Sequence, residues 1–236
     1  MRLRTLVNGM RRAAAASAAT VFLVALPAGA QILRIDGPRE PAFWVSGGIG
    51  YAQFNRGVYD GATQSLWNFG SGLVYRASVE KTISNQSSLG LMASYGRLPL
   101  RYYDLRTDAS GDCALNDRGC TAHAQVTSFG ALFHAGGGPG VHQVIEASAG
   151  VTRYANFERD GDGATLSSGT NTDGSITVGY GIGYTLSRVA QVALVQDYSA
   201  ILHERKGLPS GQSALTQAYT TRLTVRLGAG SRRPGV

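Results

Sequence analysis

SITVGYGIGYTL, residues 175–186, is the stretch that decides the fold class. Large apolar side chains alternate in it with glycine, serine and threonine. Because alternate side chains of a β-strand point to opposite faces, the stretch predicts a strand with one large apolar face and one small polar face. The apolar face consists of Ile176, Val178, Tyr180, Ile182, Tyr184 and Leu186.

The same period of two recurs in seven more segments, each long enough to cross a membrane as a strand. They are residues 43–53, 67–81, 88–96, 122–135, 141–154, 189–202 and 215–227. Short connections (82–87, 136–140 and 187–188) alternate with long polar ones (55–65, 104–121, 157–174 and 203–214). Trp44 is an exception, since it shares the small face of its segment. Eight such strands, with short turns at one rim and long loops at the other, predict an all-β, eight-stranded antiparallel transmembrane barrel.

The apolar rows could face either lipid or a protein core. No stretch after residue 30 approaches 18 consecutive apolar residues, so the sequence predicts no transmembrane helix there. In a secreted soluble barrel or sandwich, the apolar rows would face inward. Its outer surface would then be glycine, serine and threonine with few charges, which is a poor surface for solubility. We therefore expect the apolar rows, including residues 176–186, to face lipid.

Composition agrees with one exported domain. The chain has 236 residues, 43% of them hydrophobic, with 32 glycines and two cysteines, which excludes a collagen, a coiled coil and a disordered chain. Residues 1–30 have a basic start, an apolar run and a small-residue end, so we expect a signal peptide cleaved after Ala30. Its removal leaves 18 basic and 15 acidic side chains, and the net charge falls from +7 to +3. No nucleic-acid role is expected at this charge.

The expected organisation after the signal peptide has three parts. They are a short periplasmic segment, 31–40, the barrel, 41–228, and a polar tail, 229–236. By strand number, alternation and loop asymmetry, the barrel segment resembles the small eight-stranded outer-membrane barrels, such as the OmpA-like transmembrane domain and OmpX. The resemblance implies contact with outer-membrane lipid and lipopolysaccharide, assembly by the barrel-assembly machinery, and loops outside the cell. One departure is the C-terminus, where Leu227 precedes a polar tail, whereas such barrels usually finish on an aromatic residue.

Six charges fall on the predicted inner faces of the strands. They are Arg76, Glu80, Glu146, Asp197, Arg222 and Arg226. An eight-stranded barrel is just wide enough for its side chains to fill it, so no wide pore is expected. Since an isolated buried charge is costly, we expect ion pairs, Asp197 with Arg222 and Arg76 with Glu146. A narrow proton or ion path through this row is the functional alternative.

Some barrels of the resembled type modify lipid, as deacylases or acyltransferases of lipid A, so an enzyme is a second alternative. Asp197, Ser199 and His203 share one face of a predicted strand. Ser199 and His203 are roughly 13 Å apart along an extended strand, too far for a base to activate a nucleophile. No histidine has a serine two positions later, as lipid A deacylases do. The stretch from Asp160 to Asp162 lacks further calcium ligands. We expect no catalytic residue, no metal site and no cofactor.

Cys113 and Cys120 both fall in the long loop 104–121. An even pair of cysteines in an exported loop predicts a disulfide, two free thiols being the alternative. The tip of this loop carries Asp112, Asp117 and Arg118, and we expect it to meet an extracellular partner.

Aromatic side chains near the strand ends are expected at the membrane interfaces. They are Tyr51, Trp67, Tyr75, Phe133, Tyr184 and Tyr219. The sequence therefore predicts a non-catalytic outer-membrane barrel with a structural or surface-interaction role, through adhesion or recognition by its extracellular loops.

Overall fold

The computed structural model describes residues 41–106, 113–114, 118–169, 171–203 and 215–230. The expected signal peptide, the segment 31–40 and residues 231–236 of the polar tail lie outside these ranges. The described residues form ten strands: β1 (Phe43–Phe54), β2 (Val58–Asp60), β3 (Ser65–Phe69), β4 (Gly72–Ser84), β5 (Ser87–Asp104), β6 (Cys120–Ala135), β7 (Gly140–Arg159), β8 (Thr172–Ser187), β9 (Ala190–Leu202) and β10 (Leu215–Ala229). No helix of a length and apolarity that could span a membrane occurs within those ranges.

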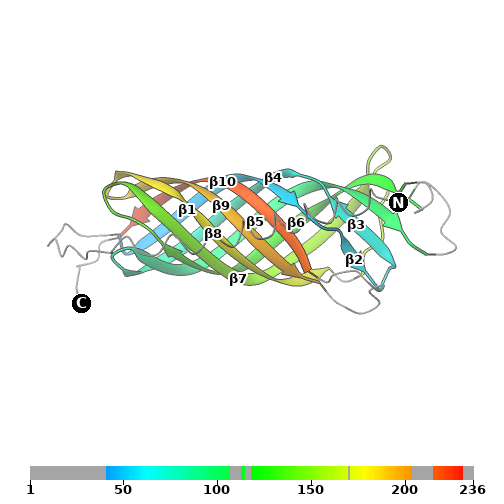
Figure 1. The fold of residues 1–236 in the computed structure, drawn as a ribbon, viewed down its shortest axis with the longest axis horizontal. Coiled ribbons are helices and arrows are strands. Elements are labelled where there is room, and N and C mark those ends of the chain that lie inside the picture. The colour runs from blue at the N-terminus through cyan, green and yellow to red at the C-terminus, as the bar shows by residue number, and fades with distance from the viewer. Residues whose placement is uncertain (1–40, 107–112, 115–117, 170, 204–214, 231–236) are drawn as a thin grey trace, which may run out of the picture. The chain divides into compact units, whose positions relative to one another are not determined.

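Eight of the ten strands close into one antiparallel barrel, as predicted. They follow the order β4-β1-β10-β9-β8-β7-β6, and β5 pairs with both β4 and β6 to complete the ring. β1 pairs with β10, so the first and last strands of the barrel are neighbours (Figure 1). Every backbone group along the wall can then be paired within the sheet, which is the requirement for a strand that crosses lipid.

The connections differ at the two ends of the barrel. At one end β4 and β5, β6 and β7, and β8 and β9 are joined by short turns. The turn between β6 and β7 is a run of glycines with one proline, and Gly138 and Gly140 have positive φ. At the other end the connections are long, and three strands there, β5, β6 and β7, rise past their neighbours (Figure 1). We call this the loop end.

Glycine sets the approach of β6 to β7. Gly130 faces Gly150 across this pair, and both lie on the inward side. A Cβ atom at Gly150 would lie 2.1 Å from the carbonyl oxygen of Phe129. Glycine at these two positions therefore permits the close approach of β6 to β7.

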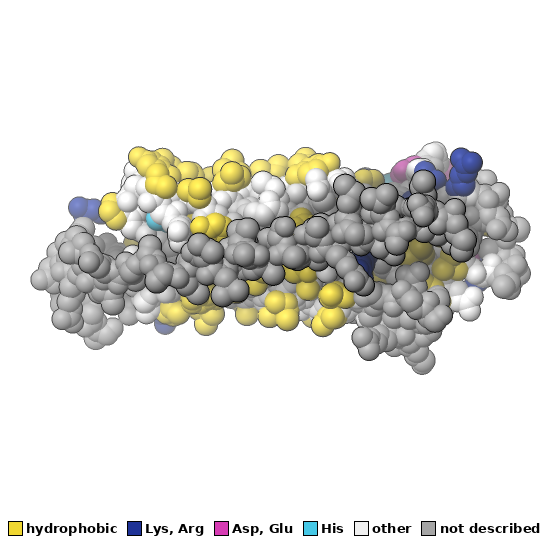
Figure 2. All heavy atoms as spheres, viewed as in Figure 1, with side chains coloured by type: hydrophobic (Ala, Val, Ile, Leu, Met, Phe, Trp, Pro, Cys, Tyr) yellow, Lys and Arg dark blue, Asp and Glu magenta, His cyan; other side chains and the backbone are white. Residues whose placement is uncertain are grey.

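Alternation places the large apolar side chains on the outside of the barrel. Ile182 is 61% exposed and Leu186 is 60% exposed, and the rest of the apolar row of β8 is exposed as well. Figure 2 shows such apolar side chains along the visible wall. A soluble protein rarely exposes so continuous an apolar surface, whereas a lipid-facing wall requires one.

The predicted strand 67–81 is wrong in one respect. The chain breaks at Gly70 and Ser71, so residues 65–69 form β3 and residues 72–84 form β4. β3 pairs with β2 in a hairpin and with the C-terminal end of β5, beyond the point where β4 begins. The predicted long loop 55–65 is therefore partly a hairpin that extends the barrel wall.

Candidate functional site

The middle of the lumen holds what we call the central ion-pair cluster: Arg76, Glu146, Asp197 and Arg222. Arg222 donates from Nε to Asp197 Oδ2 at 3.0 Å and from Nη2 to Glu146 Oε2 at 2.6 Å. Arg76 reaches the same two carboxylates, at 3.2 Å from Glu146 and 3.5 Å from Asp197. These side chains come from four strands, β4, β7, β9 and β10, so the cluster ties opposite walls of the barrel together.

Two arginines and two carboxylates balance the charge of this cluster. All four side chains are less than a tenth exposed, so each charge would be costly without its partners. His134 adds a further contact, with Nδ1 3.2 Å from Glu146 Oε1. The expected partners, Asp197 with Arg222 and Arg76 with Glu146, lie in contact in the structure.

A second buried pair lies closer to the short-turn end. Arg226 Nη2 donates to Glu80 Oε2 at 2.6 Å, and Ser78 donates to Glu80 Oε1 at 2.7 Å. The guanidinium of Arg226 stands 4.4 Å from the centroid of the Trp44 ring. Trp44 is buried, so its place on the small face follows from a cation–π contact inside the lumen.

The loop end is filled by an apolar core, which we call the apolar plug. Trp67 is its centre: its ring centroid lies 4.5 Å from that of Phe157 and 5.8 Å from that of Tyr154. Phe69 stacks on Tyr154 at 5.5 Å. The remaining members come from β2, β5 and β6: Val58, Leu98, Leu100, Tyr102, Cys120, Ala122, Ala124 and Val126.

Trp67 does not lie at a membrane interface, contrary to the sequence prediction. It is completely buried, because the β2–β3 hairpin turns it into the lumen. The other five predicted interface aromatics, Tyr51, Tyr75, Phe133, Tyr184 and Tyr219, are exposed on the outer wall.

A small cavity separates the apolar plug from the central ion-pair cluster. Its volume is about 90 Å³. Arg76, Asp197 and Arg222 form part of its lining, together with hydroxyl side chains of the surrounding strands. Leu98 and Val126, both members of the plug, also line it. The lumen is thus closed by charge pairs in the middle and by apolar packing at the loop end.

A buried pair, Asp173 with His203, was not predicted from the sequence. His203 Nδ1 lies 2.8 Å from both carboxylate oxygens of Asp173, and the His203 ring is 6.0 Å from Trp67. Ser199 instead hydrogen-bonds Thr177 at 2.8 Å. Asp197, Ser199 and His203 therefore belong to three separate contacts. Asp173 and His203 fell in predicted loops, so alternation gave no signal for them.

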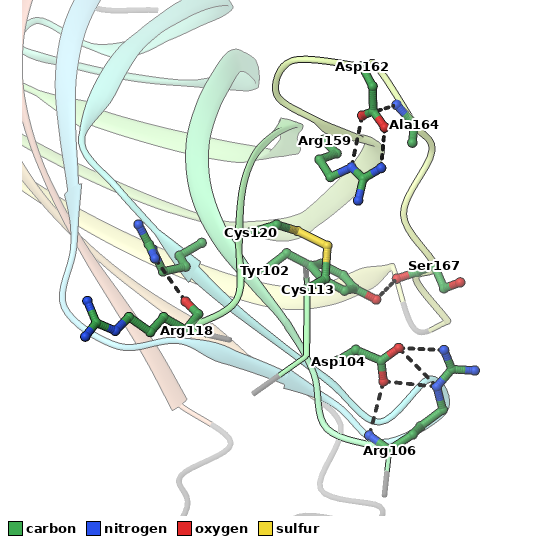
Figure 3. The surroundings of a disulfide bond; sticks show 11 residues. Tyr102, Asp104, Arg106, Cys113, Arg118, Cys120, Arg159, Asp162, Ala164 and Ser167 are labelled. Carbon is green, nitrogen blue, oxygen red and sulfur yellow. Dashed lines mark hydrogen bonds and ion pairs between the residues drawn. A yellow bond between two sulfur atoms is a disulfide. The ribbon is translucent and has the colours of Figure 1, made fainter. Parts of the chain in front are cut away.

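Three long connections at the loop end are joined into what we call the loop lobe. Cys113 and Cys120 form a disulfide (Figure 3), which was the first of the two expectations for this pair. The Tyr102 hydroxyl donates to the Ser167 carbonyl at 2.8 Å, and burial raises the pKa of Tyr102. Asp60, which is buried, accepts from the backbone of Ala62 and Gly169. Asp112 and Asp117, expected at the loop tip, lie outside the described residues.

Ion pairs between charged side chains lie in the connections of the loop lobe. Asp162 pairs with Arg159, and hydrogen bonds from that guanidinium lower the pKa of Asp162 to about 2 (Figure 3). Hydrogen bonds from Arg106 likewise lower the pKa of Asp104. Asp160 Oδ1 lies 2.9 Å from His123 Nδ1. Within the described ranges, no group of three or more histidine, cysteine, aspartate or glutamate side chains could hold a metal ion.

No protein-family model matches the chain, and no curated protein matches it. Several solved structures do. Neisserial surface protein A, NspA, is 14% identical, with 79% of this chain and 97% of that chain covered, at a TM-score of 0.49. OprG from Pseudomonas aeruginosa is 12% identical, with 83% and 100% covered, at 0.45. The outer membrane enzyme PagL is 17% identical, with 78% and 99% covered, at 0.34.

NspA is named as a surface protein, OprG as an outer membrane protein and PagL as an outer membrane enzyme. The eight-stranded fold of this chain rests on its own strand register. It agrees with the resemblance to small outer-membrane barrels that the alternation predicted.

Proposed function

We propose that the chain is an integral outer-membrane barrel that presents the loop lobe outside the cell as a rigid recognition surface, without conducting solutes. One observation carries the proposal: side chains fill the lumen at the central ion-pair cluster and at the apolar plug, while contacts join the described parts of three loops above it. A pore would need an open lumen instead of a filled one. A recognition surface needs loops whose shape is fixed before they meet a partner.

Contacts between separate loops hold that shape. The disulfide closes the loop between β5 and β6, and Tyr102 ties β5 to the segment after β7. The Leu105 backbone donates to the Gln64 carbonyl at 2.8 Å, which joins the hairpin turn to the same loop. These contacts already fix the described parts of the lobe, so those parts would lose little conformational entropy on binding a partner.

Heat modifiability tests the membrane part of the proposal. Outer-membrane fractions from expressing cells are run on a gel with and without boiling. We expect the protein in that fraction, with a mobility shift on boiling alone. A soluble protein without a mobility shift would contradict the proposal. It would mean that the apolar rows face the inside of the barrel.

Adhesion of whole cells tests the recognition part. Cells displaying the wild-type chain are compared with cells displaying Cys113→Ser/Cys120→Ser for attachment to epithelial monolayers and to immobilised matrix proteins. We expect the wild type to attach above empty-vector cells and the variant to lose most of that attachment at equal surface level. A Ser84→Ala variant, changed at the short-turn end, is the matched control. Equal attachment by empty-vector cells would remove the recognition role.

A further inference from the structure

A hydrogen-bonded polar pair lies within the exposed apolar rows of the outer wall, which we call the apolar belt. Gln196 on β9 and Thr221 on β10 face each other in register, and both side chains point outward and are exposed. The Thr221 hydroxyl donates to Gln196 Oε1 at 2.6 Å. A primary amide on a lipid-facing wall is costly, so its surroundings indicate what the wall meets there.

Gln196 lies at the middle of the outward row of β9. The other members of that row are apolar or aromatic: Val192, Leu194, Tyr198, Ala200 and Leu202. Leu194 and Leu202 are each 57% exposed, so the apolar surface continues on both sides of the amide. Leu202 stands six residues farther along the strand, or roughly 20 Å. The amide of Gln196 therefore lies inside the apolar belt and does not reach water at its edge.

The amide of Gln196 is only half satisfied within one copy of the chain. Its Oε1 accepts from Thr221, whereas its Nε2 has no hydrogen-bond partner among the described residues. Exchanging the two amide atoms would leave Oε1 without a partner instead, since a threonine hydroxyl can bond to either atom. Lipid tails offer neither a donor nor an acceptor. An occupant that supplies both at this level is therefore favoured over lipid.

Tyrosines surround the polar pair on the same outward side. Tyr180 on β8 and Tyr51 on β1 extend the row of the pair in register, one on each side. One step toward the loop end, the rings of Tyr198 and Tyr219 lie 5.3 Å apart. The pair and these four tyrosines come from four neighbouring strands, and we call them the β8–β1 face (Figure 1). Aromatic rings around a hydrogen-bonding centre give a protein partner a large contact area at a small cost in side-chain entropy.

A second copy of the chain is the occupant that suits this face. A glutamine amide carries both donors and an acceptor, so two of them can pair reciprocally. Two copies that cross the membrane in the same sense are related by a two-fold axis along the membrane normal. Each level of one wall then meets the same level of the other wall. The counterpart of Gln196 therefore lies opposite Gln196, and it supplies the donor and the acceptor that lipid lacks.

We propose that two copies of the chain associate in the membrane through the β8–β1 face, with a reciprocal hydrogen bond between their Gln196 amides at its centre. The tyrosines of the face pack around this bond. β5 lies four strands from β9 in either direction around the ring, so association through this face leaves the wall at β5 free. The dimer requires the membrane barrel, but it is independent of what the loop lobe recognises.

Sedimentation equilibrium of the purified full-length protein in detergent micelles tests the amide contact. Wild type is compared with Gln196→Leu and with Gln143→Leu, which changes an exposed outward glutamine of β7 near the short-turn end. Leucine is common in the outward rows, so both variants should fold, and heat modifiability shows that they have. We expect wild type to dimerise, with a dissociation constant roughly tenfold higher for Gln196→Leu, since a reciprocal pair of intramembrane hydrogen bonds is lost. Gln143→Leu should match wild type.

Disulfide cross-linking in phosphatidylcholine vesicles tests which face is used. Leu194→Cys places a thiol one step from Gln196 in the outward row, and Leu91→Cys places one at the matching height on β5. The two leucines are 57% and 56% exposed, and the cysteines of the chain are already bonded to each other. On mild oxidation we expect linked dimers from Leu194→Cys and few from Leu91→Cys.

Each contrary result overturns a defined part of the proposal. Wild type that stays monomeric at every ratio of protein to detergent overturns the dimer. Equal dissociation constants for wild type and Gln196→Leu overturn the amide contact, and equal cross-linking by Leu91→Cys overturns the choice of face. A protein that shows no mobility shift on boiling would instead contradict the membrane barrel, whereas a heat-modifiable monomer would leave the barrel and its loop lobe as proposed.

Discussion

The ring of Trp67 on β3 packs with its centroid 4.5 Å from the ring of Phe157 on β7, across the mouth of the barrel. β3 follows β1 in the chain, whereas β7 begins 71 residues after β3 ends, at Gly140. The contact therefore fixes the β2–β3 hairpin onto a distant wall. It makes the first long connection part of the hydrophobic core and closes the loop end of the lumen.

Replacing Trp67 by alanine should destabilise the barrel by about 3–5 kcal/mol, since it removes a fully buried aromatic side chain from a packed core. Urea unfolding of vesicle-folded protein, followed by gel mobility, measures this. Trp67→Phe keeps a ring in the site and should cost clearly less. If both variants unfold at the wild-type urea midpoint, the hairpin does not pack as described.

The misplacement of Trp67 has a physical cause. Trp67 and Phe69 have the same sequence parity as Leu73 and Tyr75, so alternation appears to run unbroken through residues 67–81. The chain breaks at Gly70, whose backbone donates to the Pro99 carbonyl at 2.8 Å. On the near side of the break odd-numbered residues point inward, and on the far side they point to lipid. The alternating pattern does not reveal this reversal, because the large apolar residues remain at odd-numbered positions on both sides of the break.

Ile182→Arg tests the orientation of the outer wall. Ile182 is exposed on β8 within the apolar belt, and an arginine at the bilayer midplane should destabilise the barrel by roughly 2–4 kcal/mol. Thr172→Arg, on the same outward face above the belt, should change stability by about 1 kcal/mol or less. Urea midpoints in vesicles compare the two. Equal effects would mean that residue 182 does not face lipid.

The turn at Asp162 should show a defined pH dependence. Its pKa in the folded chain is about 2, below the ordinary value of 3.8, because Arg159 donates to the carboxylate. A lowered folded pKa stabilises the turn above the unfolded pKa, and that stabilisation is lost as pH falls from near 4 through about 2. Carboxylate NMR of folded protein measures the titration. Arg159→Gln should return the pKa of Asp162 toward 3.8, and an unchanged titration would contradict the pairing.

The polar interior could be foreseen in part. Asp197 and Arg222 lie on the small faces of adjacent predicted strands at similar heights, so counting from the rim was enough to pair them. Arg226 and Glu80 are 146 residues apart in the chain. The alternating pattern predicts that both side chains face the lumen, but it does not predict that they pair. Asp173 and His203 lie at strand ends, where the pattern fades. The face on which a side chain lies can be predicted from the local period of two. Which side chains meet across the lumen depends on the tilt of the strands and on how the ring closes.

The central ion-pair cluster and the apolar plug fill different levels of the lumen, so single and double variants can test each by conductance. Arg222→Ala removes a buried charge partner from the central ion-pair cluster but leaves the apolar plug. Trp67→Ala opens the plug but leaves the ion pairs. We therefore expect each single variant to conduct no more than wild type in planar bilayers, and the double variant to show small, discrete openings.

Because Arg222→Ala leaves Glu146 and Asp197 with one partner fewer, it should also destabilise the barrel by about 3–5 kcal/mol. Arg222→Lys keeps the charge and controls for that loss. Wild-type conductance well above the bilayer background would contradict the sealed lumen and would favour the narrow ion path.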